Sequence, residues 1–280
     1  MSKLFACLVI TACLYQNANA QSIKTPPPSP PQTVNQVFGL SSIELSYSRP
    51  GIKGRKIFGD VVPYGKVWRT GANQATTLTF GDAVTIGGTK IPAGKYGLLT
   101  IPGADEWTII ITHQLDVTSP AAYKPDQDVV RVQAKPFQLP FPLETFSILF
   151  ANVTSNSCDL ELIWETTVVT LPITTDVDSK IMAQIDNTMN KDNHPYYTAA
   201  YYYLENGKDL NKALEWFDKA IAQDPTPGGS FFVVYQKARC LAKMGRKADA
   251  RAAAQKGIEL AKQVNNADYV ALNEKLIAAL

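Results

Sequence analysis

The chain carries two kinds of hydrophobic periodicity, and they lie in different parts of the sequence. From about residue 36 to residue 175, short runs such as SIELSY, ATTLTF and DLELIW place apolar residues at every second position. A period of two sends alternate side chains to opposite faces of a β-strand. Turn-forming segments, among them Gly87-Gly88 and residues 102–105, separate the runs. About eight or nine strands at this spacing predict an antiparallel β-sandwich.

The pattern becomes helical close to Asp176. Ala, Lys, Leu, Gln and Glu become frequent, and the apolar positions follow a helical period. Asp178 and Ser179 stand where they can cap the first helix. We therefore predict a second domain over residues 177–280 that is entirely α-helical, which makes the chain a multi-domain protein of β plus α class.

The helical part contains a repeated unit. In LNKALEWFDKAIAQDP, small residues and one Phe have the spacing of the tetratricopeptide repeat, in which the small residues let two helices pack closely. These positions are Ala213, Phe217, Ala220 and Pro225. A second unit repeats the small residues at Ala250, Ala254 and Gly257 but has no Phe. We predict a short tetratricopeptide-like domain that contacts another protein; the alternative is a helical appendage that packs on the sandwich.

The first residues predict export. Lys3 precedes an apolar run from Leu4 to Tyr15, and residues 18–20, Ala-Asn-Ala, have the small side chains that a signal peptidase requires. The run is shorter than the roughly 20 residues of a membrane span. We predict a signal peptide over residues 1–20 and a periplasmic or secreted protein with no transmembrane segment. The alternative is a lipoprotein anchored through Cys13, because ITAC resembles a lipobox.

A proline-rich stretch follows the predicted signal peptide. SIKTPPPSPPQT has no periodic apolar pattern and is typical of a polyproline-like spacer. We predict a linker over residues 21–35 and a β-sandwich domain over residues 36–175.

Charge balance and cysteine content limit the kinds of partner and site that the chain is expected to have. The chain has 27 Lys and Arg residues against 25 Asp and Glu, so its overall charge gives no reason to expect nucleic acid as a partner. Only Cys158 and Cys240 lie outside the predicted signal peptide, and metal-ligand spacings such as CxxC or HExxH do not occur. We predict no disulfide framework, no metal and no cofactor.

Positive charge is concentrated in one stretch, residues 44–70. The Gly and Pro residues there allow close approach of a ligand to the main chain, and arginines bind carboxylate or phosphate through paired donors. Trp68 adds a flat apolar face. We predict a site for an anionic or sugar-like ligand, formed by Arg49, Lys53, Arg55, Trp68, Arg69, Asn73 and Thr76. The alternative is that these side chains bond to carbonyl oxygens of their own loop while Trp68 fills the end of the sandwich.

The sequence nominates no catalytic residues. A GxSxG elbow is missing, and neither His113 nor His194 has a partner that the sequence identifies. The favoured hypothesis is therefore an exported non-catalytic binding module. Two other hypotheses remain open. One is a hydrolase of envelope or environmental polymers, with dispersed acids and the basic loop as a substrate clamp; the other is a structural envelope protein whose helices join a complex.

Three segments carry a family resemblance: SRPGIKGRKIFG, VPYGKVWRTGANQAT and IPAGKYGLLTIPGADEWTIIIT. They resemble the blocks of domain-of-unknown-function family 2911, which is found in exported proteins of Bacteroidetes and related bacteria. The resemblance covers about residues 36–174 and implies an exported all-β domain without an established activity. The family pattern commonly has Glu where this chain has Gln74. The resemblance therefore implies that any acid or base role at that position is lost here.

Overall fold

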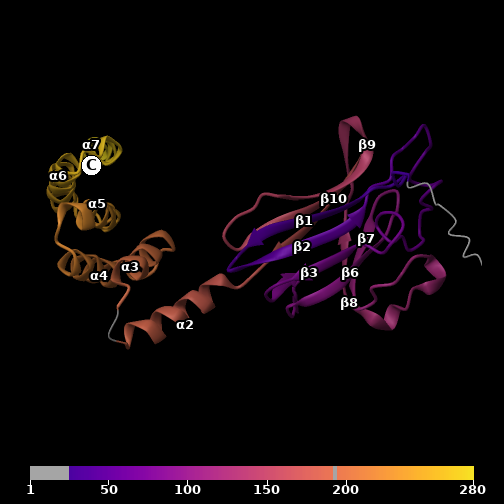
Figure 1. Cartoon of the computed structure of the whole chain (residues 1–280), viewed down its shortest axis with the longest axis horizontal. Helices are drawn as coiled ribbons and strands as arrows, with labels where there is room; N and C mark the ends of the chain where they lie inside the picture. Colours follow the sequence, from indigo (N-terminus) through magenta and orange to yellow (C-terminus); the bar gives the residue numbers. More distant parts are fainter. Residues whose placement is uncertain (1–24, 192–193) are drawn as a thin grey trace, which may run out of the picture. The chain divides into compact units, whose positions relative to one another are not determined.

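The computed structural model describes residues 25–191 and 194–280 (Figure 1). The predicted signal peptide, Cys13 and the first part of the predicted linker lie outside these residues. The chain divides after Val177 into a β unit and a helical unit.

Two antiparallel sheets form the β unit, which confirms the predicted sandwich. The first sheet has the order β1-β2-β3-β6-β7-β8, with β1 (Pro31–Phe38), β2 (Ser41–Ser48), β3 (Thr77–Phe80), β6 (Gly94–Ile101), β7 (Trp107–Thr112) and β8 (Asp128–Ala134). The second sheet has the order β5-β4-β10-β9, with β5 (Thr89–Ile91), β4 (Val84–Ile86), β10 (Ser157–Thr174) and β9 (Phe137–Ala151).

The core of the β unit lies on the inward faces of the two sheets. Ile43 and Leu45 of β2 are buried, whereas Glu44 between them is exposed. Leu160 and Leu162 of β10 are buried in the same cluster. The period of two in the sequence therefore reports directly which side chains leave water on folding.

The first strand begins earlier than the sequence predicts. β1 starts at Pro31, so residues 31–35, assigned to the linker, belong to the sheet. All of β1 pairs with β2, from Pro31 opposite Ser48 to Phe38 opposite Ser41. The strand is held by main-chain bonds to β2, and its polar composition therefore hid it from a search for apolar alternation.

Side chains close the free edge of β9. The Tyr47 hydroxyl accepts a hydrogen bond from the Ile148 N–H at 3.0 Å and lies 3.3 Å from the Ile148 carbonyl oxygen. The Arg49 Nε donates to the Phe146 carbonyl oxygen at 3.1 Å, and the Phe146 N–H donates to the Pro50 carbonyl oxygen at 2.9 Å. These bonds satisfy main-chain groups that an edge strand would otherwise offer to another strand.

The second unit is helical, as predicted. It contains α2 (Val177–Met189), α3 (Tyr196–Glu205), α4 (Leu210–Gln223), α5 (Pro227–Lys243), α6 (Lys247–Gln263) and α7 (Ala267–Ala279). The small residues of the repeat pattern are buried, and a Cβ atom on Gly257 would lie 2.7 Å from Oδ1 of Asn273. A larger residue at 257 would therefore push α6 away from α7. In the part of the chain described, no helix is both long and apolar enough to cross a lipid bilayer.

Candidate functional site

The arginines of the predicted site point to different acceptors. Arg49 donates to the Phe146 carbonyl oxygen and, at 2.7 Å, to the Ser147 hydroxyl, so it belongs to the closed edge of β9. Arg55 turns back on its own loop, where it donates to the carbonyl oxygens of Ile52 at 3.0 Å and of residue 51 at 2.8 Å. The structure therefore does not gather the predicted guanidinium groups around one hollow.

Three further predicted residues also take part in bracing the loop. The Lys53 side chain is exposed, and its main-chain N–H donates to the Glu144 carboxylate at 2.9 Å. The Asn73 amide donates to the Ser29 carbonyl oxygen at 3.0 Å. Thr76 is buried, and its hydroxyl donates to the carbonyl oxygen of residue 70 at 2.6 Å. These contacts order the segment between β2 and β3.

Trp68 belongs to an aromatic cluster at the end of the sandwich. Its ring stacks on Trp164, with centroids 5.8 Å apart and an interplanar angle of 17°. The indole N–H donates to the Gly71 carbonyl oxygen at 3.0 Å. Three other rings complete the cluster: Phe58, Trp107 and Phe146. Trp68 is thus a packing residue, as the alternative interpretation of the loop proposed.

A pocket of about 210 Å³ lies beside Trp68, between residues 61–69 and residues 118–120. Lys66 and Arg69 supply its positive charge, and none of its described lining residues is acidic. The Arg69 Nη1 donates to the Thr118 carbonyl oxygen, whereas its Nε is buried and has no hydrogen-bond partner. An unsatisfied guanidinium N–H beside a second cation is an arrangement that favours an anionic group.

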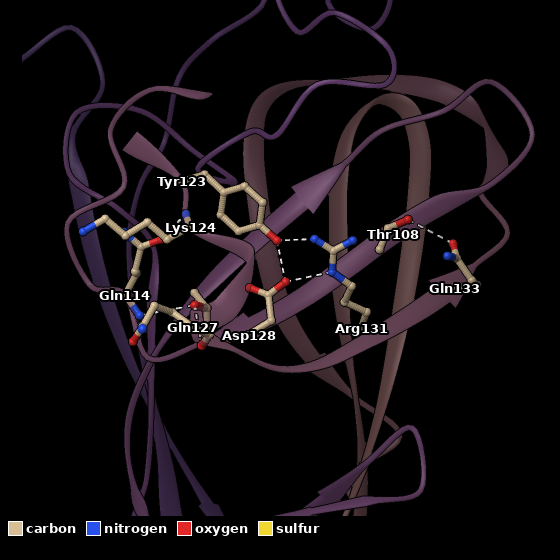
Figure 2. A network of polar contacts seen from close by, with 9 residues as sticks. Thr108, Gln114, Tyr123, Lys124, Gln127, Asp128, Arg131 and Gln133 are labelled. Carbon is tan, nitrogen blue, oxygen red and sulfur yellow. Dashed lines mark hydrogen bonds and ion pairs between the residues drawn. The ribbon is translucent and has the colours of Figure 1, made fainter. Parts of the chain in front are cut away.

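The loop between β7 and β8 supplies the second wall of this pocket, and a polar network fixes its base (Figure 2). The Tyr123 hydroxyl donates to Oδ2 of Asp128 and accepts from Nη2 of Arg131. Arg131 also donates through Nε to the same carboxylate oxygen at 2.7 Å. The Gln114 side chain accepts the Lys124 N–H at 2.6 Å. The network therefore ties Tyr123 to β8, and the bond between Gln114 and Lys124 joins the two ends of the loop to each other.

Sequence reasoning missed this second wall. Thr118, Ser119 and Pro120 lie about fifty residues after Arg69 and carry no charge. The available signal was the length of the loop itself, since long ordered loops in compact domains are often functional.

The network predicts a pH dependence. Burial first, and then the hydrogen bond to Asp128, raise the pKa of the Tyr123 phenol above its usual value of 10.0. Because the folded pKa exceeds the unfolded one, this contribution to stability is complete below about pH 10 and disappears as the pH rises through the folded pKa. We expect Tyr123→Phe to flatten the fall in unfolding free energy above pH 10, as measured by urea titration at several pH values.

Tyr64→Phe is the matched control, because Tyr64 is 47% exposed. Its pH profile should follow the wild type. An unchanged profile in Tyr123→Phe would show that this phenol does not titrate with a raised pKa.

Other titratable side chains lie away from the pocket. Cys158 and Cys240 are free and buried, and burial raises the pKa of the Cys158 thiol to about 11. The His113 ring packs against Tyr96, with centroids 5.4 Å apart. Across residues 25–191 and 194–280, no group of three or more His, Cys, Asp or Glu residues is placed to hold a metal ion.

The fold and the pocket define a β-sandwich protein with a cationic loop pocket and a helical C-terminal unit. Residues 29–173 match the model of the family described as Protein of unknown function (DUF2911). The match covers more than half of the chain, so the chain belongs to this family, which confirms the resemblance seen in the sequence. No curated protein and no solved structure shows a significant match.

Proposed function

We propose that the β unit is a non-catalytic binding module that takes a small anionic ligand in the Arg69 pocket. The proposal includes export of the protein and contact of its helices with another protein. The observation that carries the binding site is that Arg69, whose buried Nε has no hydrogen-bond partner, lines the same pocket as Lys66.

The physical argument rests on the cost of that unsatisfied donor. A buried polar group without a partner costs about 1–3 kcal/mol, and more when it is charged. A carboxylate or phosphate in the pocket would attract the Arg69 guanidinium, and a small shift of that side chain would let Nε donate a charge-assisted hydrogen bond and recover this cost. Lys66 would contribute a second favourable charge. The site is therefore better suited to an anion than to a neutral ligand.

The remaining walls favour a ligand with a small apolar part. Val61, Val67 and Pro120 line the pocket together with one side of Trp68. A volume of about 210 Å³ admits only a small group. A short branched carboxylate fits both properties, because its charge would face Arg69 while its alkyl part replaces water against the apolar walls.

Ligand-induced stabilisation tests the proposal. We expect isovalerate or inorganic phosphate to raise the melting temperature of the wild type, since a ligand at 100 times its dissociation constant adds about 2.7 kcal/mol. Arg69→Ala should lose this response. Arg55→Ala is the matched control and should keep it, because Arg55 bonds only to carbonyl oxygens of its own loop.

Lys66→Ala provides a second variant in case Arg69→Ala does not fold, and we expect it to weaken the response. Equal responses in the wild type and in folded Arg69→Ala would remove the site. A response of the wild type to neither probe would contradict it as well. Turnover of glycan, ester or phosphoester substrates by the purified protein would contradict the non-catalytic role.

A further inference from the structure

Strand β1 presents unpaired main-chain groups at one edge of the six-stranded sheet. The Arg49 N–H donates to the Pro30 carbonyl oxygen at 2.9 Å, and this bond sets which residues of β1 face β2. Along an antiparallel strand the bonding direction alternates from residue to residue. Even-numbered residues of β1 therefore bond to β2. The main-chain N–H and C=O groups of Thr33, Asn35 and Val37 point away from the sheet.

One side-chain contact agrees with this assignment. The Gln36 amide donates to the Val37 carbonyl oxygen at 2.9 Å. A side chain from the same strand thus covers an oxygen that has no strand opposite it. The Val37 side chain is 73% exposed.

The other sheet edges in the described residues are protected in ways that β1 is not. Tyr47 and Arg49 close β9. β5 has only three residues, and one of them is Lys90. β8 carries Asp128 and Arg131. Charged residues, short strands and covering groups are the usual defences against edge-to-edge pairing.

Apart from the Gln36 contact with the Val37 carbonyl oxygen, β1 has none of these defences. It has eight residues, PQTVNQVF, with no charged side chain and with its one proline at the first position. A groove of about 360 Å³, lined by Val34, Gln36, Leu149 and Phe150 among others, opens between β1 and β9. Of the sheet edges in the described residues, that of β1 therefore has the least protection.

We propose that β1 pairs antiparallel with β1 of a second copy of this chain, which joins two six-stranded sheets into one. Among the registers that the outward-facing groups at odd positions allow, the two-fold axis is placed at Asn35. Asn35 lies opposite Asn35 of the second copy, and Thr33 lies opposite Val37 of the second copy. In this register each pair exchanges both of its main-chain bonds, as bonded pairs of an antiparallel ladder do.

The side chains of β1 make this pairing self-complementary. A two-fold axis places the residue at the axis opposite its own copy, so a charged residue there would face a like charge. The residue on the axis is Asn35, which is neutral and both donates and accepts hydrogen bonds. Thr33 and Val37 form a β-branched cross-strand pair on the exposed face. A second copy is for these reasons the occupant that the edge fits.

Sedimentation equilibrium of the full chain tests the proposal. We expect the apparent mass to rise with concentration from 30.6 kDa toward twice that value. Asn35→Pro removes an outward N–H without removing a bond to β2, and proline is tolerated at such edge positions. We expect it to raise the dimer dissociation constant at least about tenfold, the equivalent of about 1.4 kcal/mol.

Two further variants at the same position separate charge from shape. Asn35→Lys places like charges at the two-fold axis and should also weaken the dimer. Because Glu44 of β2 lies opposite position 35, a lysine there is compatible with the folded sheet. Asn35→Thr is the matched control, because Thr is neutral and favours strands. It should dimerise like the wild type.

Hydrogen exchange on the wild type gives a readout that needs no variant. The amides of Thr33, Asn35 and Val37 should exchange more slowly as the protein concentration rises. A wild type that stays monomeric over the whole concentration range would overturn the proposal. A dimer that neither Asn35→Pro nor Asn35→Lys weakens, or one that leaves the β1 amides unprotected, would place the interface elsewhere and overturn it too.

Discussion

Trp68→Ala is expected to lower the free energy of unfolding of the β unit by about 3–5 kcal/mol, the usual cost of truncating a large aromatic side chain in a core. Trp68 stacks on Trp164 and contacts three further rings, so its loss leaves a cavity that the neighbouring strands cannot fill. It also leaves the Gly71 carbonyl oxygen without its donor. Urea denaturation followed by circular dichroism measures the effect.

The control for this prediction is Tyr64→Ala in the same loop. Tyr64 is 47% exposed, so its truncation should cost less than about 1 kcal/mol. Hydrogen exchange should show faster opening of strands in the β unit of Trp68→Ala and no change in peptides from residues 178–280. A loss of under about 1 kcal/mol in Trp68→Ala would mean that the aromatic cluster does not support the fold.

Phe217→Ala should destabilise the helical unit by about 3–5 kcal/mol. Phe217 is 0% exposed and lies in α4 within the cluster that also contains Ala213, Tyr203 and Val233. Its ring packs among side chains of α3, α4 and α5. We expect hydrogen exchange of α3, α4 and α5 to accelerate in the full chain, and the helical circular dichroism signal to melt at a lower temperature.

Leu272→Ala in α7 is the comparison, because Leu272 is 38% exposed. It should change the melting of the helical signal only slightly. If Phe217→Ala unfolded the strands of the β unit at the same temperature as the helices, the two units would not be independently stable.

The two periodicities predicted the fold because they report burial directly. Ile43 and Leu45 alternate with Glu44 because one face of β2 is buried, and Ala213 and Ala220 recur at helical spacing because α4 packs along one side. β1 could not be found in this way. Its position depends on main-chain bonds to β2, which leave no apolar pattern in Gln32 or Asn35.

The candidate site could be predicted only in part, because composition gives the charges of a loop but not their directions. Trp68 forms an isolated antiparallel β-bridge with Thr100 of β6, and its main-chain N–H donates to the Thr100 carbonyl oxygen at 2.7 Å. This pairing anchors Trp68 at the aromatic cluster, and the next residue, Arg69, reaches Thr118 instead. Neither the bridge nor the loop that carries Thr118 can be read from the residues near Arg69.

The Tyr47 contact with β9 has a consequence for the order of events during synthesis. Tyr47 and Ile148 are 101 residues apart in the chain. At elongation rates of about 5–20 residues per second, the ribosome adds Ile148 roughly 5–20 s after Tyr47. During that interval Tyr47 of β2 has no β9 strand to bond to, so a nascent chain of this protein needs shielding from its neighbours until β9 has emerged.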